Sequence, residues 1–367
     1  MARRIRDKTK KINKNMLREI APKLPEVTNE MFLTCNPENI KLIREFEEMH
    51  PLLSAQTKAQ YRSGIKQFTF WVKTALNDKA FYQITKRDFN RYLSYLINRG
   101  MSSSGIKFKK SCVSTICEYA ERILSEGMKE YEKFHNFTKT DIKIPKNYVY
   151  NKIAISEAEY KILIDTLMED KNYLAVAWIS AAYNTGARRG GLRGFKTEIV
   201  YKPVGDGQEY IMSNFVREKG ASEDGKQCEY IIPISTLYYL NLWVEKRGYE
   251  HEYLFTTKHN GTYNQISLGW ADDLCSNTLS DILGRRINPH LFKASAISNY
   301  LSSGMDLKFV SKHIGQHADI SVTSAFYDLR TFAEEKNGMF KKMNFIETNK
   351  EVIEEEDSKT EVTEEIK

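Results

Sequence analysis

The sequence is poor in the residues that build disulfide scaffolds and membrane spans. It has five cysteines among 367 residues, and none stands in a Cys-x-x-Cys pair or close enough to histidines to indicate zinc. It has no run of apolar residues long enough for a transmembrane helix, and its basic first residues lack the apolar stretch of a secretory signal. These absences favour a cytoplasmic protein with reduced thiols and no membrane partner.

Negative charge is concentrated in the last segment of the chain. The formal net charge is +7, and residues 351–367 contain eight acidic and two basic residues, so the rest of the chain carries +13. The opening stretch MARRIRDKTKKINKNMLR is densely basic. A basic body predicts a polyanionic partner, and nucleic acid is the first candidate. A solvated, lysine-rich surface is the alternative.

The length predicts two domains, because single hydrophobic cores rarely grow beyond about 250–300 residues. Four segments with helical periodicity follow a basic arm, and the periodicity then fades around Pro145, where a linker is expected. The acidic end is low in complexity and is expected to be disordered. The predicted organisation is a basic arm (1–37), a helical module (38–128), a linker (129–151), a second domain (152–346) and an acidic tail (347–367).

The second domain is predicted to be mainly helical with a small β-sheet. EYIMSNFVREK (209–219) and QCEYIIPIS (227–235) have the composition of two strands joined by the turn KGASEDGK (219–226). Helices are predicted around them, including NYLAVAWISAAYNTG (172–186) and most of residues 266–346. The expected fold class is therefore mainly α, with a β-hairpin in the C-terminal domain.

The segment NTGARRGGLRGFK (184–196) has the glycines of a phosphate-binding loop but not its lysine. A P-loop requires lysine and then serine or threonine after the second glycine, whereas Leu192 and Arg193 follow Gly191. ATP binding by this motif is therefore excluded. What remains is a tight turn in which Arg188 can direct two donors onto a phosphate. A basic surface loop is the alternative.

Two lysines flank the turn of the predicted hairpin, Lys219 and Lys226. A lysine in such a turn is usually a solvated charge. It can also reach a phosphodiester and donate a proton to a leaving alkoxide. Both interpretations stand on the sequence alone.

The C-terminal part of the second domain contributes two histidines, a lysine and a tyrosine. His290 and Lys293 are three residues apart and share one face of a predicted helix, and no nearby carboxylate pair completes a metal site. His317 precedes Tyr327 by ten residues in HIGQHADISVTSAFYDL (313–329). A single histidine or tyrosine in a helix is more often a packing residue, so a function has to rest on the whole set.

That set, in its order along the chain, resembles the tyrosine recombinase (phage integrase) family. TGARRGGLRGF is similar to the turn that carries the family's first arginine, and HLFKASAISNYLSSGMDLKFVSKHIGQHADISVTSAFY to its His-x-x-Arg helix, second histidine and nucleophilic tyrosine. The helical module resembles the family's core-binding domain. The resemblance covers residues 38–340, and its catalytic set comprises Arg188, Lys219, His290, Lys293, His317 and Tyr327.

The resemblance implies DNA strand exchange through a covalent 3′-phosphotyrosine, without metal ion or cofactor. Tyr327 would attack a DNA phosphodiester, Arg188 would bind the phosphate, His290 and His317 would donate hydrogen bonds or handle the proton of Tyr327, and Lys219 would protonate the leaving 5′-oxygen. It also implies a C-shaped clamp around double-stranded DNA and a homotetramer on DNA. In that assembly the segment 330–346 docks on a neighbouring protomer. The source would be a bacterium or phage.

The sequence departs from the family pattern at three positions. Lys293 stands where the family has its second arginine, Gly191 where an acidic residue is usual, and Gln316 where a glycine precedes the histidine. Arg189, Arg285 and Arg286 are candidates to compensate. Three functions stay open: an active recombinase, a catalytically impaired DNA-binding regulator on the same fold, and a relaxing enzyme similar to a type IB topoisomerase.

Overall fold

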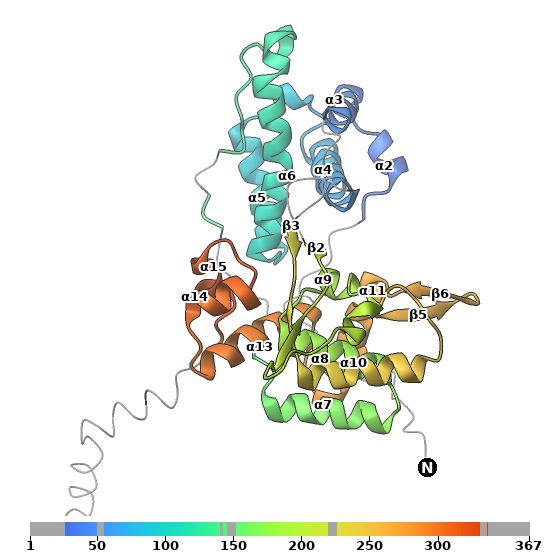
Figure 1. Ribbon diagram of the computed structural model, residues 1–367. Helices are drawn as coiled ribbons and strands as arrows, with labels where there is room; N and C mark the ends of the chain where they lie inside the picture. Colours follow the sequence, from blue (N-terminus) through green and yellow to red (C-terminus); the bar gives the residue numbers. More distant parts are fainter. Residues whose placement is uncertain are drawn as a thin grey trace, which may run out of the picture. The chain divides into compact units, whose positions relative to one another are not determined.

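The computed structural model describes residues 26–49, 55–139, 142–144, 152–218, 226–330 and 336 (Figure 1). The chain divides into two compact units, Met1–Asn151 and Lys152–Lys367, and each is described by itself. Residues 1–25 of the expected basic arm and the whole expected acidic tail lie outside the described residues. Among the helices that the structure describes, none is long and apolar enough to cross a bilayer.

The first unit is helical, and the four helices expected between residues 38 and 128 are confirmed. A short helix precedes them, and 3-10 turns connect or follow them. Asn36, Thr85 and Ser102 accept hydrogen bonds from backbone N–H groups of the first turns of α3, α5 and α6, which explains where these helices begin. The bounds are α2 Asn29–Leu33, α3 Pro37–Glu48, α4 Ala55–Ala75, η1 Phe81–Gln83, α5 Lys86–Asn98, α6 Ser103–Arg122, η2 Leu124–Glu126 and η3 Lys129–Tyr131.

Aromatic side chains dominate the core of the first unit. Phe68 of α4 meets Tyr92 of α5 with ring centroids 5.0 Å apart. Tyr131, Phe134 and Phe137 pack into the same cluster, although the sequence predicted a linker from residue 129. Burying three aromatic rings supplies enough apolar area to hold this segment on the unit. The packed part of the first unit therefore continues past residue 128.

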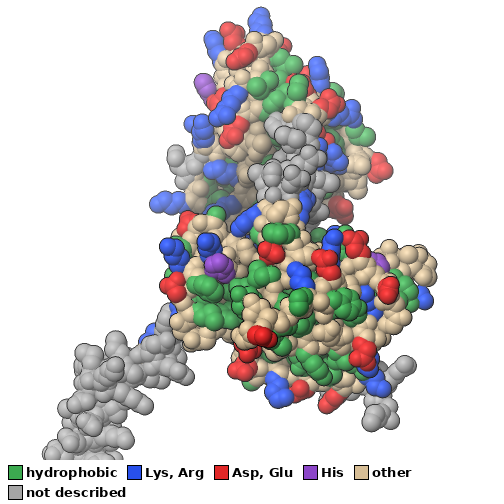
Figure 2. Space-filling view, viewed as in Figure 1, with side chains coloured by type: hydrophobic (Ala, Val, Ile, Leu, Met, Phe, Trp, Pro, Cys, Tyr) green, Lys and Arg blue, Asp and Glu red, His purple; other side chains and the backbone are tan. Residues whose placement is uncertain are grey.

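Exposed basic side chains lie on α5 and α6 of the first unit: Lys86, Arg87, Arg91, Lys107 and Arg122. In Figure 2 the visible face of this unit carries Lys and Arg side chains with Asp and Glu between them. In this view the described part of the first unit therefore has a surface of mixed charge.

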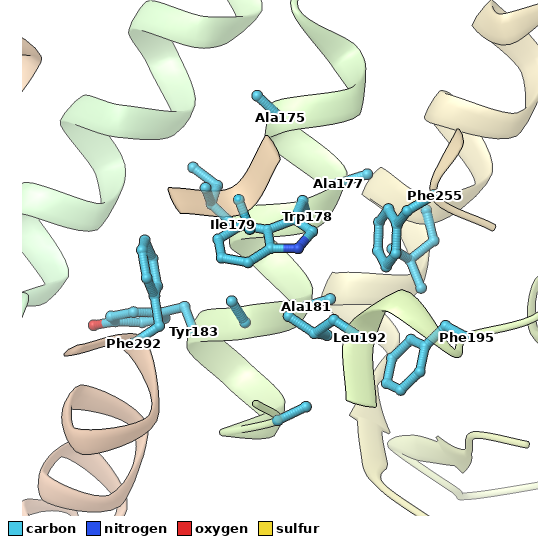
Figure 3. Close-up of a cluster of buried hydrophobic side chains, with 14 of the residues drawn as sticks. Ala175, Ala177, Trp178, Ile179, Ala181, Tyr183, Leu192, Phe195, Phe255 and Phe292 are labelled. Atoms are coloured by element: carbon cyan, nitrogen blue, oxygen red, sulfur yellow. The ribbon is translucent and has the colours of Figure 1, made fainter. Parts of the chain in front are cut away.

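The second unit is built around α8, which is buried on nearly every side. Its Trp178 is fully buried and packs edge-on against Phe292 of α13, with centroids 5.6 Å apart (Figure 3). Helices α7, α10 and α13 all contact α8. The bounds are α7 Glu157–Glu169, α8 Tyr173–Thr185, α9 Arg189–Arg193, η4 Thr197–Tyr201, α10 Ile234–Arg247, α11 Leu268–Asp273, η5 Leu274–Leu279, α12 Ser280–Leu283, α13 Pro289–Ser302, α14 Leu307–Phe309, η6 Val310–Ile314 and α15 Ile320–Phe326.

Three two-stranded antiparallel sheets complete the described part of the second unit. They pair β1 Tyr210–Met212 with β4 Ile231–Pro233, β2 Val216–Glu218 with β3 Lys226–Cys228, and β5 Thr256–His259 with β6 Thr262–Gln265. The first two sheets confirm the predicted hairpin, with each expected strand broken into two. The β5–β6 hairpin was not predicted, although its turn residues Asn260 and Gly261, with φ of 48° and 82°, are a strong hairpin signal.

Candidate active site

Tyr327 lies at the end of α15 with its ring held against α13. Only 8% of the residue is exposed. Ser298 of α13 holds the backbone that follows the ring: its hydroxyl donates to the Tyr327 carbonyl at 3.0 Å and accepts from the Leu329 amide at 2.8 Å. Burial raises the pKa of Tyr327, and Arg188 opposes that shift. The phenol is thus fixed in place and protonated at neutral pH.

His290 lies in the first turn of α13, within hydrogen-bonding distance of the tyrosine. Asn288 caps this helix by accepting from the Leu291 amide, and Pro289 occupies its first position. The Nε2 atom of His290 is 2.8 Å from the Tyr327 hydroxyl. Burial, and then the positive charges of Lys152, Arg188 and Lys293, lower the pKa of His290 to about 4. The ring is therefore neutral at pH 7 and able to accept a proton.

His317 is fixed by a chain of two hydroxyl groups. Its Nδ1 is 2.7 Å from the Thr323 hydroxyl, which donates to Ser311 Oγ at 2.8 Å. Because the one hydroxyl proton of Thr323 goes to Ser311, Nδ1 must be the donor to Thr323. Nε2 of the neutral ring then carries a lone pair, and it is buried with no hydrogen-bond partner among the described residues. Burial, followed by nearby cations, lowers the pKa of His317 to about 4.

Arg188 precedes α9, just after the left-handed turn at Gly186, whose φ is 64°. A Cβ at Gly186 would lie 2.9 Å from Ile314, so the turn needs glycine for both its backbone conformation and its space. One guanidinium nitrogen, Nη1, lies 3.2 Å from Glu218 Oε2, and 31% of the arginine side chain is exposed. Arg188 is thus anchored at one side and accessible at the other.

Lys293 is fully buried beneath the site, and its ammonium group contacts backbone oxygens. It donates to the carbonyls of Gly186 at 3.2 Å, Ile314 at 3.4 Å and Gly315 at 2.6 Å. An ammonium has three donors, and these contacts use all of them. Burial, and then the charge of Arg188, lower the pKa of Lys293 to about 7. Lys293 therefore ties the turn before Arg188 to the turn before His317.

Gln316, at the position where the family pattern has glycine, adopts a left-handed backbone conformation with φ of 53°. Such a conformation costs a non-glycine residue roughly 1–2 kcal/mol. The side-chain amide offsets this cost by donating to the carbonyls of Glu229 at 3.1 Å and His313 at 3.2 Å. The turn before His317 is therefore held without glycine.

Of the six predicted site residues, the structure brings five together. Arg188, Lys293 and His290 contribute to the low pKa of His317, and both histidine rings lie beside Tyr327, at centroid distances of 5.2 Å and 4.6 Å. Lys219 lies outside the described residues. On the other strand of its hairpin, the Lys226 ammonium donates to the Gln316 carbonyl at 3.1 Å.

Sequence reasoning missed four residues of this site: Lys152, Glu218, Ser311 and Thr323. Lys152 Nζ is 5.9 Å from the Tyr327 ring centroid. Thr323 stands four residues before Tyr327, about one helical turn away, and this spacing could have indicated that it lies near the site. Arg189 and Arg285, considered as compensating cations, form ion pairs with Asp272 and Glu159. Within the described residues, no group of three or more His, Cys, Asp or Glu side chains is placed to hold a metal ion.

No family model matches the chain. Curated relatives match it over most of their length. The chain is 50% identical over 333 residues to the SPbeta prophage-derived recombinase-like protein YomM of Bacillus subtilis (strain 168), covering 90% of this chain and 99% of that protein. It is 22% identical over 325 residues to the tyrosine recombinase XerC of Lacticaseibacillus casei (strain BL23), covering 82% and 97%.

The fold is similar to that of a solved DNA complex. A lambda integrase tetramer bound to a Holliday junction matches with a TM-score of 0.58 at 18% identity, over 80% of this chain and 79% of that one. The likeness shows a shared mainly helical fold with small two-stranded sheets.

Proposed function

The chain belongs to the tyrosine recombinase (phage integrase) family, and from this premise we propose that it cleaves and rejoins DNA through a 3′-phosphotyrosine at Tyr327. The observation that carries the proposal is the placement of the phenol, with its hydroxyl 2.8 Å from Nε2 of His290 and its ring beside that of His317. A packing tyrosine needs neither imidazole. An attacking phenol needs a group that takes its proton.

In the cleavage step the Tyr327 oxygen forms a bond to phosphorus and the bond from phosphorus to the 5′-oxygen breaks. His290 takes the phenolic proton, and Lys219 gives one to the leaving 5′-oxygen. Rejoining reverses the step, with a 5′-hydroxyl attacking the phosphotyrosine. The energy of the phosphodiester is kept in the protein–DNA bond, so no nucleotide triphosphate is consumed.

On this proposal, the negative charge of the DNA phosphate raises the pKa values of the two histidines. Both pKa values are lowered by burial and by nearby cations, Arg188 among them. A phosphodiester beside Arg188 adds a negative charge, which raises a nearby histidine pKa. His290 then becomes a better base, and a protonated His317 keeps its Thr323 contact while Nε2–H donates to a non-bridging oxygen.

The exposed side of Arg188 is the proposed anchor for that phosphate. Its guanidinium can present two donors to the non-bridging oxygens, where negative charge gathers in the transition state. Lys293 instead contributes its positive charge from below and holds two backbone turns in place. On this proposal the second phosphate-binding position of the family pattern acts here through positioning.

The proposed substrate is double-stranded DNA in the cytoplasm of a bacterial host. The domain boundaries predicted from sequence, and a homotetramer on DNA in which residues 330–346 dock on a neighbour, belong to the same proposal. The support is the family membership and the basic excess of the chain. Deleting residues 330–367 tests the docking role: unchanged assembly and recombination would refute it.

A nicked substrate tests the main proposal. The DNA site is first selected from a random duplex library with the Tyr327→Phe variant, which keeps the fold but lacks the nucleophile. Wild-type protein is then incubated with that site carrying a nick beside the scissile phosphate, so that the short released strand diffuses away. We expect a covalent adduct on a denaturing gel with wild type and none with Tyr327→Phe. Tight binding by wild type without any adduct would reject the proposal.

The contacts of Lys293 favour one alternative, a DNA-binding regulator with impaired catalysis. All three of its donors are engaged by backbone carbonyls, so it offers none to a phosphate. A regulator would bind the selected site with strong salt dependence, equally in wild type and Tyr327→Phe. Any adduct at Tyr327 would exclude this alternative.

A further inference from the structure

Glu218 is a buried carboxylate with both oxygens engaged at the edge of the candidate site. Its side chain is 5% exposed and pairs with Arg188 through Oε2 at 3.2 Å. The hydroxyl of Tyr230 donates to Oε1 at 2.6 Å, and Tyr230 is itself fully buried. Two fixed partners leave the carboxylate a single position, from which it orients the guanidinium of Arg188.

Gly191 makes room for this carboxylate. A Cβ at Gly191 would lie 2.5 Å from Glu218 Oε1 and 3.2 Å from the Tyr230 hydroxyl. Gly191 is helical within α9 and has no positive φ, so backbone conformation does not account for the glycine. The need for space accounts for the glycine, because any side chain at position 191 would displace Glu218.

We propose that Glu218, reaching over Gly191 from strand β2, is the positioning residue that orients Arg188 toward the DNA phosphate. The inference rests on the proposed function for what Arg188 binds. The position three residues after Arg188 is Gly191 and carries no acid. The carboxylate that contacts Arg188 comes instead from Glu218 on strand β2, 27 residues after Gly191. Glycine at 191 and glutamate at 218 form one pair, and changing either alone breaks it.

An ion pair with a purely structural role would only stabilise the unit. The test must therefore separate an effect on the orientation of Arg188 from an effect on stability. The Glu218→Gln variant keeps the shape and a hydrogen bond to Tyr230 but loses the charge that holds Arg188. Glu218→Gln should affect binding in two opposite directions, because the phosphate contact of Arg188 is lost while a negative charge near DNA is removed. Kd should therefore change by less than about tenfold, whereas cleavage should fall about 100-fold, as when one preorganised donor is lost. A fall in the single-turnover rate at saturating protein that clearly exceeds the change in Kd is the signature of positioning.

Moving the carboxylate provides the rescue. Gly191→Asp alone crowds Glu218, and Glu218→Ala alone frees Arg188, so each should lose cleavage about 100-fold. The double variant places an acid on α9, where the space left by Glu218 admits it, and should recover to within about tenfold of wild type. Gly190→Ala is the matched control, since its Cβ would have no neighbour within 4 Å. A double variant no better than its worse parent would overturn the inference.

A binding measurement tests the same role of Glu218 without requiring cleavage. In the Tyr327→Phe background, Arg188→Ala should weaken binding of the selected duplex about tenfold when Glu218 is present, the value of one charge-assisted hydrogen bond. In a Glu218→Gln background the same change should cost less than about twofold, because the arginine is already misplaced. An equal loss in both backgrounds refutes the role of Glu218. A wild type that forms no adduct refutes only the proposed function.

Discussion

Replacing Thr323 by valine should impair catalysis by releasing His317. Thr323 is fully buried, and its hydroxyl joins His317 Nδ1 at 2.7 Å to Ser311 Oγ at 2.8 Å. Valine has nearly the same shape, so the change removes the hydroxyl and leaves the packing. The orphaned buried partners should lower the free energy of unfolding by roughly 1–3 kcal/mol. With the acceptor of its Nδ1 proton gone, the imidazole no longer has a fixed tautomer.

The expected kinetic effect of Thr323→Val is a loss of about 10- to 100-fold in single-turnover cleavage, by analogy with residues that orient metal-bound histidines. Thr323→Ser keeps the hydroxyl and should retain most activity. Ser324→Ala, on the exposed side of the same helix, should match wild type. The assay is adduct formation on the nicked duplex, beside urea unfolding of each variant. If Thr323→Val cleaves within twofold of wild type, the hydroxyl chain does not set the state of His317.

Three further predictions concern charge. Lys219→Ala should abolish cleavage of an ordinary duplex but not of one with sulfur as the 5′-bridging atom, because a thiolate leaves without a proton; equal loss on both substrates would contradict a proton-donating role. Lys293→Met should lower the free energy of unfolding by roughly 1–3 kcal/mol, since the carbonyls of Gly186, Ile314 and Gly315 lose their donor, and unchanged denaturation would contradict this. The pKa values of His290 and His317 are about 4 in the folded protein, against an ordinary value of 6.5. The folded state therefore binds fewer protons than the unfolded state, so the stabilisation by the two neutral rings is present above pH 6.5 and is lost as the pH falls toward 4. Thermal unfolding should depend less on pH in the His290→Gln/His317→Gln variant, and an unaltered pH profile would refute the lowered pKa values.

The helices were predictable because their sequences agree with the fold at several levels. In the first unit, apolar periodicity and capping residues such as Thr85 indicate the same boundaries. The end of that unit was not predictable from periodicity, because Tyr131 ends a short 3-10 turn and Phe134 and Phe137 follow it without a regular repeat. The β5–β6 hairpin was predictable in principle from Asn260 and Gly261.

The candidate site was predictable only where it follows a family pattern. The order of the arginine, histidines and tyrosine can be read along the chain, and five of the six predicted residues lie together. The acceptors of Lys293 are backbone carbonyls, which no side-chain motif encodes. The pairing of Glu218 with Arg188 joins residues 30 positions apart, so only the fold reveals it.

Two of the departures from the family pattern thereby gain a physical explanation. Gly191 leaves space for Glu218, and Gln316 replaces the usual glycine by holding its left-handed backbone through two side-chain hydrogen bonds. Lys293 contacts the backbone carbonyls of the turns that carry Arg188 and His317.

On the proposed function, Tyr327 becomes covalently joined to DNA. The most direct measurement is mass spectrometry of the proteolysed adduct formed on the nicked, selected duplex. We expect a single nucleotide-bearing peptide, modified on Tyr327 through a 3′-phosphate. An adduct on another residue, or none from a protein that binds the duplex tightly, would contradict it.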